Sequence, residues 1–465
     1  MTLRTDFDRL KQAHLRGAFS YEQRIELLSR LDAAVRRNRE AVVEACSQDF
    51  GRRARIETLA ADVMVTLDEI KYARKNLRRW MRPQRRAINL TFKPARGEIR
   101  YTPLGVVGVV APWNYPFQLA IIPLANAIAA GNRVMIKPSE FTPSVSALIE
   151  KLVGEVFSDD EVTVVQGDAS VGAEFTKLPF DHLIFTGSTA VGRHVMAAAA
   201  ANLTPVTLEL GGKSPALIAP DYPVAQAAER IAFGKCFNAG QTCVAPDYVL
   251  LPEAQLEAFI TAFADSIARR YPDMAGNAEY TGIINTRQST RLQAWLDEAK
   301  AAGVRTVACG PEQLPGSENL RLMPPTVLVN PPDNLTVMQQ EIFGPLLPVI
   351  TYEGLEQALG FVLARDKPLA FYLFDRESAR VDAVLGRICA GSVCINDVLV
   401  QFGQDDLPIG GVGASGMGHY HGRDGFLTFS KAMPVMHQAR LNGMHLFDPP
   451  YGRIITRLVD FLTRP

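Results

Sequence analysis

The chain has 465 residues, with 49 Lys and Arg against 49 Asp and Glu, so its formal net charge is zero. Apolar residues make up 47% of it and charged residues 21%, which is typical of a folded globular protein and excludes an intrinsically disordered chain. A zero net charge provides no overall attraction for nucleic acid, so we expect no nucleic-acid partner. The length allows about two to three domains.

The cysteines and the first residues indicate a cytoplasmic protein. The six cysteines form no CxxC pair and no dense framework, so we expect no disulfide scaffold. Residues 1–17 carry charges throughout and contain no apolar core of a signal peptide. His419 and His421 are the only close histidine pair, and no third ligand lies near them in the sequence, so we predict no metal site.

The first predicted elements are helices over residues 20–52 and 54–80. Apolar residues recur there at helical spacing, and Ser20 with Gln23 forms a capping box at the start. Arginines cluster over 78–86 around a tryptophan. Arginine beside an aromatic ring can bind nucleic acid, but the neutral chain favours a solvated helix end.

Residues 88–105 predict a β-hairpin, because two alternating runs flank a turn that contains Pro94 and Gly97. The next segment, 101–132, contains no Asp, Glu, Lys or Arg and has the hydropathy of a membrane span. Prolines and side-chain amides interrupt it, so we predict a buried strand, a loop and a buried helix, and no transmembrane segment.

From there on, strands alternate with helices, which predicts an α/β fold with parallel, doubly wound sheets. In the first half, the predicted strands are 105–111, 133–138, 162–167, 182–187 and 206–211. Beyond Gly212 the same alternation returns, with the apolar runs PALIA, YVLLP, TVLVN, LLPVITY, LAFYLF and SVCIN. The repetition predicts a second α/β domain.

Two glycine-rich segments are candidates for phosphate binding. FTGSTAVG (185–192) follows a predicted strand and opens a predicted helix, whose first N–H groups suit a pyrophosphate, although a plain strand–helix turn needs the same glycines. IGGVGASGMG contains the literal GxGxxG pattern at Gly411, Gly413 and Gly416, but no buried strand precedes it. We interpret the second segment as a tight loop with closely packed backbone.

Three side chains could supply the parts of a covalent catalyst. Cys243, in FNAGQTCVAP, is a candidate nucleophile, although an isolated cysteine is more often an apolar filler. Glu209 ends an apolar strand, where a carboxylate is costly without a role or a partner, and it is a candidate general base. Asn114, in a loop bounded by prolines, is a candidate oxyanion donor. Their spacing in the sequence does not by itself bring the three together.

With these segments and others, the chain resembles the NAD(P)-dependent aldehyde dehydrogenase superfamily. The matching segments are PWNYPFQLAIIPLANAIAAGNRVMIKPSEFTP (112–143), FTGSTAVG (185–192), LELGGKSPA (208–216), FNAGQTC (237–243), EIFGPLLPV (341–349) and GGVGASGMGHYHGRDGFLTFSK (410–431). The YHG near the end resembles the class 3-like branch of the superfamily. WMRPQRR, QDDLPIGG and RLNG…PPYGR further resemble the bacterial coniferyl aldehyde dehydrogenases of that branch.

The resemblance implies a fold with a Rossmann-like cofactor domain, a second α/β catalytic domain and a bridging β-hairpin. We expect the cofactor domain over 1–210, with an oligomerisation hairpin at 88–104, and the catalytic domain over 211–408. Residues 409–465 are expected to return to the cofactor domain and to form a bridging strand and a C-terminal tail.

The reaction that the resemblance implies is NAD(P)-dependent oxidation of an aldehyde to its carboxylic acid. Cys243 would attack the carbonyl, Asn114 with the Cys243 backbone N–H would bind the oxyanion, and Glu209 would activate the water that hydrolyses the thioester. NAD is the expected cofactor and NADP the alternative, because a carboxylate at position 140 repels a 2′-phosphate. The implied cofactor-binding residues are Trp113, Lys137, Glu140, Gly187, Ser188, Glu341 and Phe343.

Exposed strand edges at 88–104 and 429–437 need a partner, so we expect a homodimer. The tail over 451–465 predicts a short amphipathic helix that packs on the body or on a partner subunit, with a membrane surface as the alternative. The expected substrate is an aromatic aldehyde such as coniferaldehyde. The alternatives are a medium- or long-chain aliphatic aldehyde, an ester hydrolysed by the cysteine, and a non-catalytic binding role.

Overall fold

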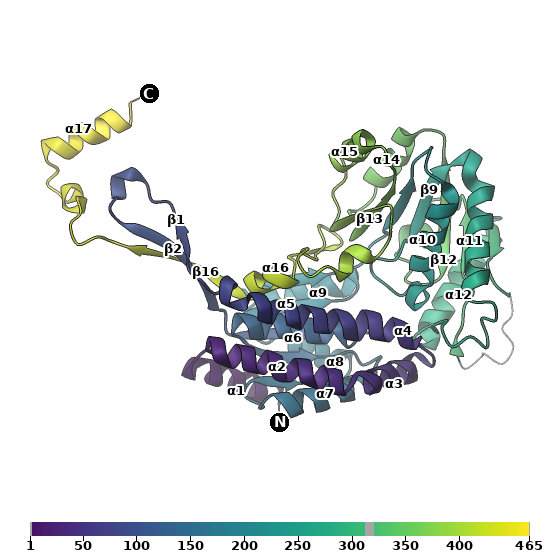
Figure 1. The fold of residues 1–465 in the computed structure, drawn as a ribbon, viewed down its shortest axis with the longest axis horizontal. Coiled ribbons are helices and arrows are strands. Elements are labelled where there is room, and N and C mark those ends of the chain that lie inside the picture. Colours follow the sequence, from purple (N-terminus) through teal and green to yellow (C-terminus); the bar gives the residue numbers. More distant parts are fainter. Residues whose placement is uncertain (1, 312–319, 465) are drawn as a thin grey trace.

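The computed structural model describes residues 2–311 and 320–464. Figure 1 shows two sheets with their helices, which form the body of the molecule, and a small third sheet that forms an arm projecting from the body. The α/β architecture predicted from the alternation of strands and helices is therefore confirmed.

The first sheet has six strands in the order β15-β7-β6-β3-β4-β5, all parallel except for β15. Its strands are β3 (Val106–Val110), β4 (Arg133–Lys137), β5 (Val162–Val164), β6 (His182–Thr186), β7 (Val206–Glu209) and β15 (Gly416–Met417). Their apolar runs are buried almost without interruption, as expected for parallel strands covered on both faces. The five strands predicted for the first half of the chain are all present.

The second sheet has seven strands in the order β10-β11-β12-β9-β8-β13-β14. The six predicted apolar runs form β8 (Pro215–Ile218), β9 (Tyr248–Pro252), β11 (Thr326–Val329), β12 (Leu346–Tyr352), β13 (Ala370–Phe374) and β14 (Ser392–Ile395). The antiparallel edge strand β10 (Arg305–Ala308) was not predicted, because its partly exposed RTVA sequence lacks the apolar run of a central strand.

The N-terminal segment supplies helices to both sides of the first sheet, because its first helix shares a core with Val106 and Met135 and its later helices share one with Val107 and Val134. It comprises α1 (Leu3–Arg16), α2 (Tyr21–Arg37), α3 (Arg39–Phe50), α4 (Arg55–Thr58), a π-helical turn η1 (Leu59–Met64) and α5 (Val65–Trp80). The Ser20–Gln23 capping box is confirmed. The helical periodicity predicted over 20–52 is confirmed by α2 and α3, and the break between them lies at Asn38, whose side chain and N–H both bond to the Ala34 carbonyl. Helix α1 was not predicted.

The uncharged segment 101–132 folds as predicted into strand β3, a loop and the helix α6 (Gln118–Ala130), every residue of which is buried. None of the helices in the described part of the chain has the length and apolar character needed to cross a membrane. The remaining helices are α7 (Pro143–Val156), α8 (Ala169–Thr176), α9 (Thr189–Ala200), α10 (Val224–Cys236), α11 (Leu256–Arg270), α12 (Thr286–Ala301), α13 (Thr336–Gln339), α14 (Leu355–Leu363), α15 (Ser378–Leu385), α16 (Gly422–Thr428) and α17 (Arg453–Leu462).

The arm is an antiparallel sheet in the order β1-β2-β16. The prediction of a hairpin at 88–105 is right about the pairing and wrong about the first strand. That strand is β1 (Gln84–Arg86), which pairs with β2 (Arg96–Pro103), while Leu90–Phe92 forms a 3₁₀ turn ahead of Pro94, which has no N–H to donate to a ladder. The predicted terminal strand is confirmed as β16 (Ser430–His437), and the amphipathic α17 lies at the far end of the arm (Figure 1).

Candidate active site

The candidate site is built on the carboxyl ends of parallel strands, the usual place for functional groups in an α/β sheet. Glu209 is the last residue of β7 and is 5% exposed. Its Oε1 has no hydrogen-bond partner among the described residues, and burial raises its pKa well above the ordinary value. A buried carboxyl group with a free oxygen can accept a proton from a water or a substrate that enters the site.

Cys243 lies in a strained loop between α10 and β9. Residues Phe237–Gly240 form a short turn, η3. Within it, Asn238, Ala239 and Gly240 have φ angles of 52°, 52° and 74°. A Cβ on Gly240 would lie 2.4 Å from the Gly344 carbonyl oxygen, so only glycine fits there. Backbone strain of this kind persists where the surroundings fix the conformation, and it is frequent at functional sites. Cys243, which follows, is partly exposed.

The loop after β3 brings Asn114 to the Cys243 loop. The Asn114 carbonyl accepts hydrogen bonds from Asn238 Nδ2 and from Arg53 Nη1, each at 3.1 Å. The neighbouring Tyr115 hydroxyl and Thr242 Oγ1 lie 2.6 Å apart in a second hydrogen bond between the loops. The Asn114 side-chain amide bonds to none of the described residues, so it can donate to a ligand. The structure thus joins the two loops that carry the predicted oxyanion donor and nucleophile.

The charges around Cys243 show that Glu209 and Glu341 lie in the same site. Burial raises the pKa of the Cys243 thiol above its ordinary value, and the carboxylates of Glu341 and Glu209 raise it further. Burial also raises the pKa of Glu341 to about 8, with the charge of Asp247 as the second cause. The site therefore holds its thiol in the protonated form at neutral pH.

The predicted pyrophosphate segment has the geometry that its sequence suggested. Ser188 is the N-cap of α9, and its hydroxyl accepts from the Val191 N–H at 3.4 Å. A Cβ on Gly187 would lie 2.5 Å from the Phe185 ring, so glycine keeps this strand–helix turn open. The N–H groups of Thr189 and Ala190, which have no partner among the described residues, can receive phosphate oxygens.

Lys137 and Glu140 lie together at the end of β4. The Lys137 ammonium is 2.9 Å from a Glu140 carboxylate oxygen and donates to the Pro138 carbonyl at 3.1 Å. Lys137 is 3% exposed, whereas Glu140 is exposed. A paired donor and acceptor at a strand end suit the two hydroxyl groups of a ribose. The donor set therefore fits the adenosine end of a dinucleotide.

Trp113 and Phe343 are in contact two residues from Glu341. The Trp113 and Phe343 rings meet edge to face, with centroids 5.1 Å apart. Phe343 has a φ of 49°, a strained value for a residue with a side chain. A Cβ on Gly211 would lie 1.9 Å from Glu341 Oε2, so the glycine gives this carboxylate its place beside the exit of β7. The aromatic rings of Trp113 and Phe343 fit the ring of a nicotinamide, and the Glu341 carboxylate fits a ribose hydroxyl.

The sequence did not reveal a buried polar network behind Asn114. Arg53 and Asp62 form an ion pair of 2.8 Å in which neither side chain is exposed. Asp62, in the π-helical turn η1, also accepts from the Gln118 N–H. Glu57, in α4, accepts from the Asn238 N–H at 3.1 Å and from Thr281 at 2.7 Å. Three charged residues close together at the start of a predicted amphipathic helix are the signal that could have indicated this network.

The glycine-rich segment around Gly411 is a tight loop, as predicted. A Cβ on Gly411 would lie 1.9 Å from the Ser415 carbonyl oxygen, which leaves no space for a side chain. Gly416 and Met417 form β15, which pairs with Leu208 and Glu209 of β7. The segment supports the strand that ends in Glu209.

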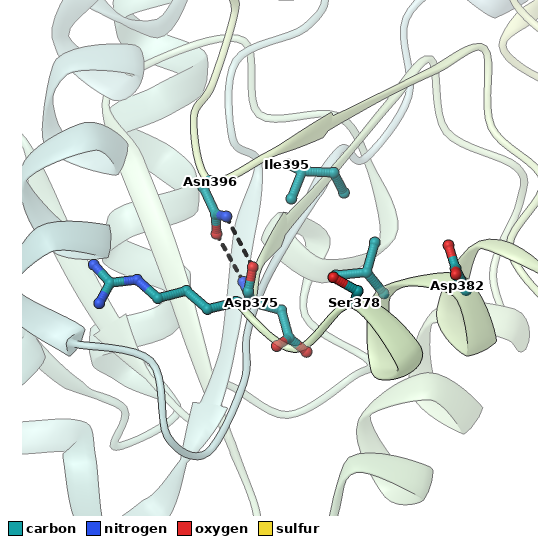
Figure 2. Close-up of a pocket in the computed structure, with 7 residues that line it drawn as sticks. Asp375, Ser378, Asp382, Ile395 and Asn396 are labelled. Atoms are coloured by element: carbon teal, nitrogen blue, oxygen red, sulfur yellow. Dashed lines mark hydrogen bonds between the residues drawn. The ribbon is translucent and has the colours of Figure 1, made fainter.

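A pocket of 390 Å³ elsewhere contains none of the predicted site residues. Figure 2 shows it at the carboxyl ends of β13 and β14, where Asn396 exchanges two 2.8 Å hydrogen bonds with the Asp375 backbone. Arg380 binds the Asp375 carboxylate. Asp375 and Asn396 are thus paired with each other, and the candidate site remains the one around Cys243.

Known proteins resemble the chain over nearly its full length. The model of the aldehyde dehydrogenase family matches residues 11–435. A probable coniferyl aldehyde dehydrogenase of Pseudomonas aeruginosa is 52% identical, over 94% of this chain and 91% of that protein. A coniferyl aldehyde dehydrogenase of a Pseudomonas species is 46% identical, over 98% of this chain and 95% of that protein.

Solved structures show the same fold. The substrate-bound state of Staphylococcus aureus AldH matches with a TM-score of 0.94 and 37% identity, over 100% of both chains. A betaine aldehyde dehydrogenase of Staphylococcus aureus, solved in complex with NAD⁺, matches with a TM-score of 0.84 and 25% identity, over 96% of this chain and 89% of that one.

Proposed function

The chain belongs to the aldehyde dehydrogenase family, and on this basis we propose that its substrate is an aromatic aldehyde such as coniferaldehyde. Oxidation of an aldehyde with NAD(P) is the family's activity, and the chain performs it. The aromatic substrate is supported by identities of 52% and 46% to coniferyl aldehyde dehydrogenases. The observation that carries the reaction is the convergence of Cys243, Glu209 and Asn114 on one site.

In the proposed mechanism, the Cys243 thiol gives its proton to solvent water, and its sulfur then forms a bond to the aldehyde carbon. The free amide of Asn114 and the Cys243 backbone N–H donate to the oxygen that becomes an oxyanion in the thiohemiacetal. The bond between the Asn114 carbonyl and Asn238 keeps this amide in register with the Cys243 loop. Donors that are fixed before the reaction stabilise the developing charge without further reorganisation.

NAD(P) supplies the acceptor for the hydride that leaves the substrate carbon. We propose that Lys137 and Glu140 hold the adenosine ribose and that Gly187 and Ser188 face the pyrophosphate. Trp113, Glu341 and Phe343 receive the nicotinamide end. NAD is the preferred form in this proposal, because the exposed carboxylate of Glu140 repels a 2′-phosphate.

Glu209 completes the cycle in this proposal. Its carboxylate takes a proton from a water molecule, the water oxygen bonds to the thioester carbon, and the Cys243 thiolate leaves with release of the acid. The buried position of Glu209 raises its pKa, so the carboxylate is a stronger base toward water than an exposed one. Its unpartnered Oε1 is the atom that supports this role.

We also propose that the protein is a homodimer of the cytoplasm. The arm projects from the body, and the exposed edges of its β1 and β16 offer ladder hydrogen bonds to a second copy (Figure 1). All six cysteines are free, which agrees with a reducing compartment. Sedimentation at several concentrations would test the assembly, with a concentration-independent monomer as the contrary result.

The substrate proposal is tested with a panel of aldehydes and NAD. Coniferaldehyde, benzaldehyde, a medium-chain alkanal and a short semialdehyde are compared by kcat/KM, with the acid product measured by chromatography because coniferaldehyde absorbs where NADH does. The aromatic aldehydes should rank first, and Cys243→Ala should abolish turnover of all four. A medium-chain alkanal that ranks first by tenfold or more would favour the aliphatic alternative over the aromatic one.

A further inference from the structure

Asp247 lies at the point where three segments of the proposed site meet. It follows Cys243 by four residues, immediately before β9, and is 2% exposed. Its backbone N–H donates to the Ser214 carbonyl at 2.8 Å, which ties the segment after Cys243 to the segment after Glu209. A buried carboxylate at such a junction is costly unless both of its oxygens are used.

Both oxygens of Asp247 are used to hold the segment that contains Glu341 and Phe343. Oδ1 accepts from the Ile342 N–H at 2.8 Å, and this N–H lies between the two proposed cofactor residues. Oδ2 binds the ammonium of Lys213, whose side chain is also largely buried. The carboxylate therefore connects the backbone of the cofactor segment to a cation from the segment after β7.

Lys213 extends the connection to two further carbonyl groups. Its ammonium donates to the Val337 carbonyl at 2.7 Å and to the Gln340 carbonyl at 3.0 Å. With Asp247, the three hydrogen-bonding directions of the ammonium are all engaged. Arg291 of α12 also donates to the Ile342 carbonyl, at 2.7 Å. Ile342 is thus fixed at its N–H and at its carbonyl.

The segment needs such support because its own conformation is unfavourable. Phe343 occupies the left-handed region, with a φ of 49°. Non-glycine residues are unfavourable there and keep the conformation only when neighbouring contacts impose it. Without the bonds at Ile342, the Phe343 ring would lose its fixed edge-to-face contact with Trp113, and the Glu341 carboxylate its place against Gly211.

We propose that Asp247 and Lys213 are positioning residues that hold Glu341 and Phe343 ready for the nicotinamide end of the cofactor. This inference rests on the proposed function, in which those two residues receive that end. The inference goes beyond the proposed function, because neither Asp247 nor Lys213 touches the cofactor in that proposal. Loss of the pair weakens cofactor binding, whereas the chemistry of the Cys243 thiol, which needs no cofactor to attack an ester, largely remains.

The test compares Asp247→Asn and Lys213→Met with the wild-type protein in two measurements. The first is the Kd of NAD, followed by quenching of tryptophan fluorescence. The second is hydrolysis of p-nitrophenyl acetate without NAD, in which the Cys243 sulfur bonds to the acetyl carbon, p-nitrophenolate leaves, and water releases acetate. Asp375→Asn is the matched control, because it removes a similarly buried partner of an arginine on the same sheet, away from the site.

Both variants should raise the Kd of NAD by about tenfold or more, which corresponds to the loss of one charge-assisted hydrogen bond. Ester hydrolysis should fall by no more than about twofold, and Asp375→Asn should leave the Kd of NAD at the wild-type value. An unchanged Kd in both folded variants would overturn the inference, and so would an equal loss of NAD binding and ester hydrolysis. A wild-type protein that neither binds NAD nor oxidises aldehydes would instead refute the proposed function.

Discussion

Replacement of Glu57 by glutamine should change the way in which stability depends on pH. The Glu57 carboxyl group is 7% exposed and accepts from Asn238 and Thr281, and its burial raises its pKa from 4.5 to about 7. The folded-state pKa is raised above the unfolded value, so this group's contribution to stability is fully present below pH 4.5 and is lost as the pH rises through 7.

The size of the effect follows from the two pKa values. One pKa unit of difference between the folded and unfolded states corresponds to about 1.36 kcal/mol. A group with a pKa of 4.5 in the unfolded state and about 7 in the folded state therefore reduces the free energy of unfolding by about 2.5 kcal/mol between pH 5 and pH 8. Glu57→Gln does not ionise and lacks this loss. Its free energy of unfolding should therefore improve by about 2.5 kcal/mol relative to wild type over the same interval.

Urea unfolding at pH 5, 6, 7 and 8 measures this difference. Glu26→Gln, on the exposed surface of α2, is the control and should give a difference that does not vary with pH. A difference between Glu57→Gln and wild type that is equally flat would show that Glu57 is not protonated in the folded protein at pH 5. The raised pKa of the buried Glu57 carboxyl group would then be wrong.

Four further results are expected. Glu209→Gln should still form the thioester but should hydrolyse it at least about 100-fold more slowly, which stopped-flow measurement would record as a burst of NADH followed by slow turnover. Asn114→Ala should lower kcat/KM by about 100- to 1,000-fold, while alkylation of Cys243 keeps its wild-type rate. That alkylation, measured with iodoacetamide in a Cys389→Ser background, should increase about tenfold per pH unit from pH 7 to 9, because the raised pKa keeps the thiol protonated. Glu140→Ser should raise the ratio of NADP to NAD turnover by about tenfold or more, since the repelling carboxylate is gone. Four results would contradict these expectations. They are wild-type turnover without a burst in Glu209→Gln, an unchanged kcat/KM in Asn114→Ala, a Cys243 alkylation rate that does not rise with pH, and an unchanged cofactor ratio in Glu140→Ser.

Local sequence signals predicted the elements whose structure is decided locally. The alternation of apolar runs with helical segments indicated parallel strands, and the runs of β3 and β7 are largely buried. The capping box at Ser20 depends on residues only three positions apart and formed as predicted. Glu209 stood out because a carboxylate at the end of an apolar strand is costly, and the structure shows it buried with a free oxygen.

Contacts between distant segments could not be predicted in this way. Arg53 reaches the Asn114 carbonyl across 61 positions of the sequence, and Lys213 reaches Gln340 across 127, so no local pattern connects these residues. The first strand of the hairpin was placed too late in the chain, because its position depends on pairing with β2 rather than on its own alternation. Propensity and periodicity describe a segment, whereas these features depend on what the folded chain puts beside it.

The proposed mechanism is tested most directly by trapping the intermediate on Cys243. Glu209→Gln would be mixed with NAD and coniferaldehyde, quenched in acid and examined by intact-protein and peptide mass spectrometry. The peptide with Cys243 should gain the mass of the acyl group of the substrate, only when NAD is present, and no adduct should form in a variant that also carries Cys243→Ala. NADH formation with no acyl group on Cys243, or an adduct on another residue, would contradict the covalent mechanism proposed for this site.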